Sequence, residues 1–412
     1  MGFAELGLST TALEGVLEMG YDTPTPIQEQ AIPLVMSGRD VLACAQTGTG
    51  KTAAFVLPVL SKIAHRGRIG ALIVTPTREL AVQIERVGRT IAHSTHHAVV
   101  AVYGGVGYTA QTKALHHGVD LLVATPGRLL DLQSRGDIDL DHVEILILDE
   151  ADRMLDMGFW PDVRRILRLL PKQRQNLLFS ATLDDKVLRL IGDTLDNPAR
   201  VDITPASTPV EAIEQLVYPV NSMQKTELLV ALFRETTDYR AIVFTRTKAR
   251  ADRVAAALNS SGVAAATIHS DLSQQKREET LDRFRSGRYH LLISTDVMAR
   301  GIDVEGITHV VNFDVPDKPD DYVHRIGRTA RAGETGIAIT LVSHEEIPQL
   351  TEIERVTRQV LVTRDVEGFE YKERIVPRED RQTDTSSPRA MFRGGVMGRG
   401  RGPSGGRTQR RF

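Results

Sequence analysis

The chain has 412 residues, 41% of them hydrophobic and 25% charged, which is enough to bury the cores of two domains of ordinary size. Its single cysteine excludes an internal disulfide framework. No stretch approaches the roughly 18 apolar residues that a membrane span needs. The first residues also lack the basic and apolar segments of a secretory signal, so we expect a cytoplasmic protein.

The net charge of −2 conceals a strongly basic end of the chain. Between Thr385 and Phe412 there are seven arginines and no aspartate or glutamate. The end of the chain has too few large apolar side chains to offset the entropy lost on ordering, so we expect residues 366–412 to be disordered. Its charge favours binding to a polyanion, and the alternative is an inert end that keeps the protein in solution.

Short apolar runs alternate with helical patterns along most of the chain, which predicts βαβ units around parallel sheets. The predicted strands form a first set at 41–45, 71–75, 99–102, 120–124, 145–149 and 176–180, and a second set at 240–245, 264–269, 290–295, 308–314 and 336–342. Prolines and small polar residues separate the two sets and predict a linker. We therefore expect a first α/β domain at 1–203, a linker at 204–211, a second domain at 212–365 and a tail at 366–412.

The segment VLACAQTGTGKT, residues 41–52, places a strand, a glycine-bearing loop and a helix start in succession. Gly48 and Gly50 allow the loop to turn its N–H groups toward a phosphate. Lys51 adds a positive charge, and Thr52 offers a hydroxyl to Mg²⁺. The segment departs from the strict phosphate-loop pattern because Ala45 replaces the first glycine, and the alternative is a chance glycine-rich turn.

A second candidate site lies in EILILDEADRMLD, residues 144–156, where an apolar run ends on three carboxylates. Ligands gather at the carboxyl ends of parallel strands, so we expect Asp149 and Glu150 to lie near Lys51. Asp149 suits Mg²⁺, and Glu150 suits the orientation and deprotonation of an attacking water. The alternative for this cluster is a solvated helix N-terminus, which the phosphate loop makes the weaker interpretation.

Taken together, these motifs resemble those of the DEAD-box ATP-dependent RNA helicases, and the resemblance extends from residue 3 to about residue 345. The matching strings are GYDTPTPIQ (20–28), AQTGTGKT (45–52), PTREL (76–80), GG (104–105), TPGR (125–128), DEAD (149–152), SAT (180–182), VFTRT (243–247), QQKR (274–277), STDVMARGIDV (294–304) and HRIGRTARAG (324–333). The compact N-terminus, short loops and arginine–glycine tail are most similar to the bacterial RhlE-type subgroup.

The resemblance implies two tandem RecA-like domains that bind ATP and Mg²⁺ between them, with Mg²⁺ held by Thr52 and Asp149. It places nucleotide contacts at Tyr21, Thr23, Gln28, Gln46, Thr47, Gly48, Thr49, Gly50, Lys51, Thr52, Asp303, Arg328 and Arg331. It places catalytic roles at Lys51, Asp149, Glu150, Ser180, Thr182, His324, Arg328 and Arg331.

Several of these positions have a physical reason. The amide of Gln28 can both donate to and accept from an adenine edge, which favours ATP over GTP. Arg328 and Arg331 would point together from the second domain and reach the γ-phosphate only when the domains close. We expect Phe3 to pack beneath this first motif, and His324 with Arg325 to connect the site to the SAT motif and the phosphate.

The resemblance also implies an RNA surface with no evident aromatic base reader. Its expected residues are Thr77, Arg78, Gly104, Gly105, Thr125, Gly127 and Arg128 in the first domain and Arg246, Gln274, Arg277 and Thr295 in the second. Such groups contact phosphate and 2′-hydroxyl, so we expect little sequence preference. Ribosomal or RNA-decay proteins are possible partners, and a monomer is the default expectation.

Two rival functions fit part of the pattern. A DNA helicase of the same superfamily would share the phosphate loop, and a non-enzymatic RNA clamp would use the tail and the closed state. The GYDTPTPIQ and DEAD strings argue against the DNA helicase, while the clamp is left open. The pairs His96–His97 and His116–His117 lack the spacing of a zinc site, so we interpret them as solvated histidines.

Overall fold

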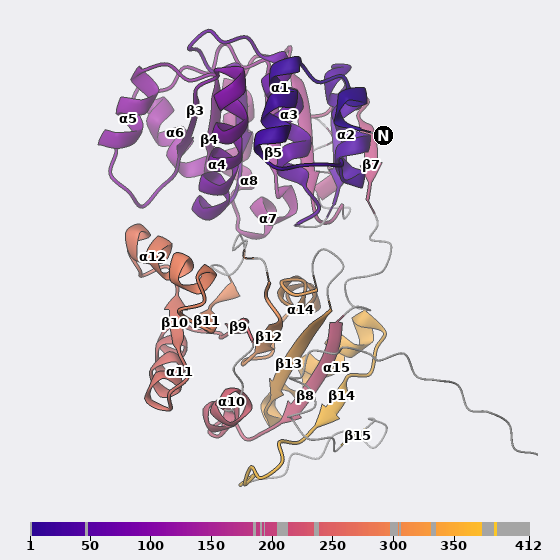
Figure 1. Cartoon of the computed structure of the whole chain (residues 1–412), viewed down its shortest axis with the longest axis vertical. Coiled ribbons are helices and arrows are strands. Elements are labelled where there is room, and N and C mark those ends of the chain that lie inside the picture. The colour runs from indigo at the N-terminus through magenta and orange to yellow at the C-terminus, as the bar shows by residue number, and fades with distance from the viewer. Residues whose placement is uncertain are drawn as a thin grey trace, which may run out of the picture.

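The computed structural model describes residues 2–45, 48–183, 187–189, 192, 194–203, 213–234, 239–296, 304, 306–330, 335–372 and 383–384. Two domains lie one above the other, each built on a parallel sheet with helices on both faces (Figure 1). The predicted linker, 204–211, lies outside the described residues.

The first domain contains a seven-stranded sheet in the order β3-β4-β2-β5-β6-β1-β7, with every pairing parallel. Its strands are β1 (Val41–Cys44), β2 (Ala71–Val74), β3 (Val99–Val102), β4 (Leu121–Ala124), β5 (Ile145–Asp149), β6 (Gln175–Ser180) and β7 (Ala199–Asp202). Its helices are η1 (Phe3–Leu6), α1 (Thr10–Glu18), α2 (Pro26–Met36), α3 (Lys51–Lys62), α4 (Arg78–Thr95), α5 (Thr109–His116), α6 (Pro126–Ser134), α7 (Ala151–Asp156) and α8 (Trp160–Leu169).

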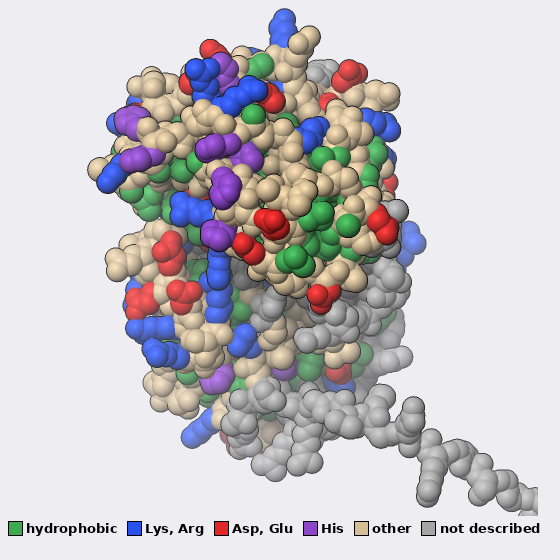
Figure 2. Space-filling view, turned by 45° about the horizontal axis from the view of Figure 1, so that its top comes forward, with side chains coloured by type: hydrophobic (Ala, Val, Ile, Leu, Met, Phe, Trp, Pro, Cys, Tyr) green, Lys and Arg blue, Asp and Glu red, His purple; other side chains and the backbone are tan. Residues whose placement is uncertain are grey.

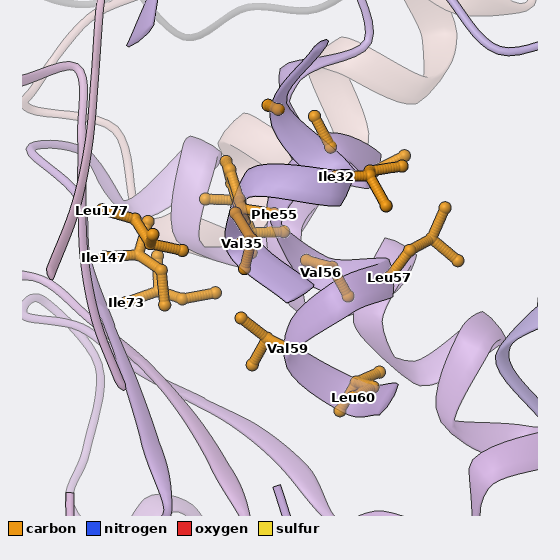
Figure 3. Packing of buried hydrophobic residues seen from close by; sticks show 14 of the residues in the cluster. Ile32, Val35, Phe55, Val56, Leu57, Val59, Leu60, Ile73, Ile147 and Leu177 are labelled. Atoms are coloured by element: carbon orange, nitrogen blue, oxygen red, sulfur yellow. The ribbon is translucent and has the colours of Figure 1, made fainter. Parts of the chain in front are cut away.

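The core of the first domain follows from strands that are apolar on both faces. One buried cluster joins the sheet to α1–α4, and a second joins its other face to α6–α8. In Figure 3, Ile73, Ile147 and Leu177 of the strands face Val35 of α2 and Phe55 of α3. This packing brings the carboxyl ends of β1 and β5, and the residues that follow them, to one edge of the sheet.

The second domain contains a parallel sheet in the order β10-β11-β9-β12-β13-β8-β14-β15. Its strands are β8 (Ile213–Pro219), β9 (Ala241–Phe244), β10 (Ala265–Ile268), β11 (Leu291–Ser294), β12 (His309–Asn312), β13 (Gly336–Val342), β14 (Val362–Arg364) and β15 (Thr383–Asp384). Its helices are α10 (Lys225–Phe233), α11 (Lys248–Ser260), α12 (Gln274–Arg285), α14 (Pro319–Ile326), η2 (His344–Glu346) and α15 (Ile347–Thr357). Helices α10 and α11 cover one face, and α12, α14 and α15 cover the other.

The prediction of two tandem α/β domains with parallel sheets is confirmed, and every predicted strand is present. Strands β7, β8, β14 and β15 were not predicted. The second domain also extends beyond the predicted start of the tail. Val366 is buried, and Gln224 donates from Nε2 to the carbonyl of Glu370 at 2.9 Å and accepts at Oε1 from the N–H of Lys372 at 2.8 Å. The basic segment from Thr385 onward lies outside the described residues.

Candidate active site and RNA surface

The phosphate loop lies between β1 and the first turn of α3. Gly48 and Gly50 have φ angles of 87° and 92°, in the left-handed region that favours glycine. A Cβ atom at Gly50 would lie 2.6 Å from Nε2 of Gln28, so this backbone fits only because Gly50 has no side chain. Gln46 and Thr47 lie outside the described residues, while Thr49 and Thr52 are half-buried.

Lys51 is the first residue of α3 and is 7% exposed. Within the described part of the chain its buried Nζ has no hydrogen-bond partner. A buried ammonium is costly unless something pairs with it, and a helix N-terminus favours negative charge at the same place. The residues at this loop therefore fit a bound phosphate group.

Gln28 connects the adenine motif to the phosphate loop. Its Oε1 accepts from the N–H of Thr25 at 2.9 Å, and its Nε2 donates to the carbonyl of Gly50 at 3.2 Å. Tyr21 is half-buried and stacks on Phe3 with ring centroids 6.4 Å apart, so Phe3 packs beneath this motif as predicted. Thr23 is exposed.

The carboxylates that follow β5 differ in their surroundings. Asp149 is 3% exposed, and its Oδ1 accepts from the N–H of Glu150 at 3.0 Å. Burial raises the pKa of Asp149 to about 7, because desolvation and the nearby Glu150 outweigh the attraction of Lys51. Glu150 has a φ of 53°, and its Oε2 accepts from Nη1 of Arg153 at 2.9 Å. The ion pair and this strained backbone fix the direction of the Glu150 carboxylate.

Asp152, the last residue of the DEAD string, connects it to the SAT motif. Its Oδ2 accepts from both the N–H and the Oγ1 of Thr182, each at 3.1 Å. The hydroxyl of Ser180 accepts from the N–H of Asp152 at 3.3 Å and donates to the carbonyl of Thr182 at 2.6 Å. No role was predicted for Asp152, although its position in the DEAD string could have indicated one.

A pocket between the domains combines residues of both. It is lined by Glu150, Asp152, Arg153, Asp156 and Ala181 of the first domain and His324 and Arg328 of the second. The structure thus brings His324 and Arg328 to the same pocket as the carboxylates. Arg331 and Asp303 lie outside the described residues.

Arg325 does not face this pocket, which corrects the expectation that it reaches the phosphate. It is 3% exposed, and its Nε and Nη2 donate to the two carboxylate oxygens of Asp296 at 2.5 and 2.7 Å. Its Nη1 donates to Oδ1 of Asn312 and to the carbonyl of Asp314. All these acceptors belong to the second domain, so Arg325 stabilises the fold of that domain.

At the expected RNA surface of the first domain, glycines allow Arg78 to approach the backbone closely. A Cβ atom at Gly105 would lie 1.8 Å from Nη1 of Arg78, so the Gly104–Gly105 loop lies directly against that guanidinium. Thr77 and Thr125 are the buried N-cap residues of α4 and α6, and Gly127 is exposed. These groups follow β2, β3 and β4, neighbouring strands whose carboxyl ends lie at the same edge of the sheet.

Two predicted RNA contacts are buried. Arg128 is 8% exposed and donates to Oε1 of Gln111 at 3.0 Å and to the carbonyl of Val106 at 2.8 Å. Arg277 is 3% exposed and forms an ion pair with Glu79 of the first domain. Both guanidinium groups therefore have partners within the protein.

The other predicted RNA contacts of the second domain are Arg246, Gln274 and Thr295. Nη2 of Arg246 donates to the carbonyl of Val315 at 3.3 Å and to Oδ1 of Asp317 at 3.2 Å, and its side chain is 48% exposed. Gln274 is buried and accepts from Arg277 at 3.2 Å, and Thr295 is half-buried. Within the described ranges, no three His, Cys, Asp or Glu side chains converge as metal ligands.

Histidine side chains are spread over the upper part of the face drawn in Figure 2. His96, His116 and His117 are exposed, while His97 is half-buried with Nε2 3.0 Å from the carbonyl of Ile63. Among the described residues, no helix is both long and apolar enough to cross a membrane.

Comparisons with known proteins agree with this geometry. The DEAD/DEAH box helicase family matches residues 25–190, and the helicase conserved C-terminal domain matches residues 224–333. The DEAD-box ATP-dependent RNA helicase CshA of Geobacillus kaustophilus is 45% identical over 358 residues, covering 87% of this chain and 77% of that protein. CshA of Listeria monocytogenes is 44% identical over 358 residues and covers 87% of this chain and 69% of the relative.

Solved structures show the same architecture. S. cerevisiae Dbp5 bound to RNA and ADP BeF3 is 34% identical with a TM-score of 0.80, covering 88% of this chain and 95% of that chain. Mss116p bound to ssRNA and AMP-PNP is 28% identical with a TM-score of 0.78, covering 95% of this chain and 80% of that chain.

The predicted RhlE-type subgroup is not supported, because these bacterial relatives carry the name CshA. The two-domain match, the identity to named helicases and the convergence of the DEAD carboxylates with Arg328 all agree on the family. This chain therefore belongs to the DEAD-box family and is an ATP-dependent RNA helicase that binds ATP and RNA and acts as an RNA-dependent ATPase.

Proposed function

We propose that ATP and single-stranded RNA together close the two domains, and that closure completes the hydrolytic site. The observation that carries this proposal is the pocket that joins Glu150 of the first domain to Arg328 of the second. Neither residue forms such a site without the other domain, so hydrolysis depends on closure. A guanidinium placed against the γ-phosphate stabilises the charge of the transition state.

The first domain supplies the phosphate and metal groups. Lys51 and the N–H groups at the start of α3 hold the triphosphate, which provides the partner that Nζ lacks in the described part of the chain. Thr52 and Asp149 hold Mg²⁺, an ion that prefers oxygen ligands and keeps several waters. Mg²⁺ neutralises phosphate charge when bound and favours the ionised form of Asp149.

We assign the activation of water to Glu150, whose carboxylate Arg153 holds in one direction at 2.9 Å. Glu150 orients the attacking water and accepts its proton. Asp152 transmits a change at this site to Ser180 and Thr182 through the bonds at 3.1 and 3.3 Å. His324 lies in the same pocket and couples the second domain to it.

The RNA surface comprises two kinds of residue. Arg78, Gly104, Gly105, Thr125 and Gly127 present donors to the RNA backbone, while Arg128 holds the loop that carries the glycines. In the second domain, Arg246 and Thr295 are accessible, whereas Gln274 and Arg277 lie at the contact with the first domain. Backbone contacts of this kind select single-stranded RNA without strong sequence preference.

Binding along both domains bends the RNA strand, so a few base pairs of a short duplex separate locally. Phosphate release then reopens the domains. We propose that the protein works as a monomer in the cytoplasm, remodelling RNA or RNA–protein complexes, with ribosomal or RNA-decay proteins as candidate partners. The basic segment at 385–412 tethers RNA near the two domains.

The decisive experiment measures ATP hydrolysis with RNA, with DNA of equal length and with neither, alongside unwinding of a short blunt RNA duplex. Glu150→Gln should bind ATP and RNA but lose hydrolysis by a factor of about 100 or more, with sustained unwinding lost as well. Equal stimulation by DNA would contradict the RNA assignment. Continued remodelling by Glu150→Gln at the parent rate would favour the clamp.

The role of the basic tail is tested separately by removing residues 385–412. The shortened chain should bind RNA more weakly, with a flatter dependence of affinity on salt, because fewer phosphates are neutralised. Its ATP hydrolysis without RNA should not change. An unaltered salt slope would return the tail to an inert solubilising role.

A further inference from the structure

Tyr108 lies just after the Gly104–Gly105 loop and immediately precedes α5, and it is 37% exposed. The Cζ atoms of Arg128 and Arg135 lie 4.3 and 4.2 Å from the centroid of its ring. Arg128 and Arg135 are seven residues apart, about 10 Å along α6, so they approach the ring from opposite sides. The ring of Tyr108 is therefore enclosed between two cations, an arrangement that the ring quadrupole stabilises.

The hydroxyl of Tyr108 adds a third contact. It donates to Oδ2 of Asp131 at 2.6 Å, and Asp131 also lies 3.9 Å from Nε of Arg128. Asp131 and Arg128 belong to α6, and Arg135 is the residue that ends it. One side chain from the glycine loop thus contacts three side chains along a single helix.

Helix α6 also holds the 104–107 loop directly, through Arg128. Arg128 donates from Nη2 to the carbonyl of Val106 at 2.8 Å and from Nη1 to Oε1 of Gln111 at 3.0 Å. Both acceptors are neutral, so these bonds alone hold the Arg128 guanidinium less firmly than a bidentate carboxylate would. The ring of Tyr108 covers one face of that guanidinium and keeps it at Val106.

We propose that Tyr108 is a positioning residue for RNA binding, which fixes the 104–107 loop and the start of α6 as one rigid surface. The inference rests on the proposed RNA surface, because the loop and Thr125–Gly127 are the groups that it holds in register. A surface that is already ordered loses less conformational entropy on binding, so its contribution appears as RNA affinity. Tyr108 itself need not contact RNA, since both faces of its ring are covered.

The test compares Tyr108→Leu and Tyr108→Phe in the full chain, using RNA-stimulated ATP hydrolysis. Leucine removes the ring, and the RNA concentration for half-maximal stimulation should rise by about fivefold to tenfold, while kcat at saturating RNA stays within about twofold. Phenylalanine keeps the ring between the guanidinium groups and should restore most of the affinity. Gln133→Ala, on the same helix but outside this cluster, is the matched control and should resemble the parent.

Arg135→Gln provides a second variant because the Arg135 side chain is 47% exposed, and it removes one cation from the ring together with the ion pair to Asp137 at 3.2 Å. Its half-saturating RNA concentration should rise by about twofold to threefold, above that of Gln133→Ala. Unchanged half-saturation in Tyr108→Leu or, if that protein does not fold, in Arg135→Gln overturns the positioning role. A fall in kcat without a change in half-saturation overturns it as well. An absence of RNA stimulation in the parent would instead refute the proposed function itself.

Discussion

The sheets of the two domains have the same strand order, but the domains differ at the helix that follows β1 in the first and β8 in the second. Position by position, β1 in the first sheet corresponds to β8 in the second, and β5 corresponds to β12. A helix that begins with Lys-Thr follows both β1 and β8, namely α3 at Lys51 and α10 at Lys225. Both lysines are buried, at 7% and 2% exposure.

The difference lies in what surrounds each ammonium group. Nζ of Lys225 donates to the carbonyl of Phe313 at 2.7 Å and forms an ion pair with Glu346. Glu346 in turn accepts from the N–H of Val315 at 3.2 Å. In the second domain an internal carboxylate thus pairs with the lysine, where in the first domain we propose that a phosphate does. A buried lysine therefore marks a ligand site only when the described residues leave it without a partner.

Lys51→Ala should lose most of its ATP turnover. Removing the cation that pairs with the phosphates should lower RNA-stimulated hydrolysis by a factor of about 100 or more. The free energy of unfolding without nucleotide should change by less than about 1 kcal/mol, because Nζ of Lys51 has no hydrogen-bond partner to lose among the described residues. Steady-state hydrolysis and urea unfolding measure both quantities, and undiminished turnover would refute the assignment of this loop.

The corresponding change in the second domain, Lys225→Ala, should reverse that pattern. It leaves Glu346 buried without its cation, which costs about 3–5 kcal/mol of unfolding free energy. ATP binding to the first domain should persist. Urea unfolding gives the stability, and Lys248→Ala is the control, since its ion pair with Asp271 is exposed and should contribute less than about 1 kcal/mol. Similar losses of unfolding free energy in Lys51→Ala and Lys225→Ala would contradict the proposed difference between the two lysines.

The sequence was sufficient to predict the two-domain architecture and to locate the motifs whose residues are adjacent in the chain. Buried parallel strands are apolar on both faces, so β1–β6 and β9–β13 were visible as continuous runs. Strand β8 was missed because Glu214 and Gln215 interrupt its apolar pattern. These polar residues are accommodated by partners far along the chain, Arg364 at 3.2 Å and Tyr322 at 2.9 Å.

The direction of individual arginines could not be predicted from their motifs. Arg325 and Arg128 have motif positions that suggest phosphate or RNA, yet their guanidinium groups bind acceptors inside a domain. The partners Asp296 and Val106 lie 29 and 22 residues away in the sequence. Only folding brings them to these guanidinium groups. The proposed role of Tyr108 could not be predicted for the same reason, because its partners Arg128 and Arg135 lie far along the chain.

The domains should also differ in their response to acid. Burial lowers the pKa of His309 in β12 to about 4, below the usual 6.5. The unfolded chain therefore takes up the proton first, so this contribution to stability is present above about pH 6.5 and is lost as the pH falls toward 4. Asp149 in the first domain has the opposite sign, because its raised pKa of about 7 lowers stability as the pH rises from about 4 to 7.

His309→Phe separates these contributions, since a phenyl ring can pack against Phe233 and Tyr239 without titrating. Between pH 7 and 4.5 the parent should lose about 2 kcal/mol more unfolding free energy than the variant. Urea unfolding at several pH values measures the difference. Parallel pH profiles for the two proteins would mean that His309 does not account for the acid sensitivity of the second domain.

The smallest expected effect concerns the contact between the domains, where Glu79 of α4 pairs with Arg277 of α12. Each single change to glutamine should lower kcat/KM for RNA in the ATPase reaction, because one charge is left without its partner at a buried contact. If the pair holds the domains together in the active state, the double variant should cost less than the sum. A coupling of about 1 kcal/mol, or roughly fivefold, is expected for residues in contact.

The pair Lys276–Glu279 supplies the control cycle, because it lies within α12 and both side chains are about half exposed, at 55% and 41%. Its coupling in the same assay should be close to zero. Additive losses for Glu79 and Arg277 would mean that Arg277 leaves Glu79 and binds an RNA phosphate in the active state. The salt dependence of RNA binding then decides between the two roles, since only a phosphate contact lowers the slope when Arg277 is replaced.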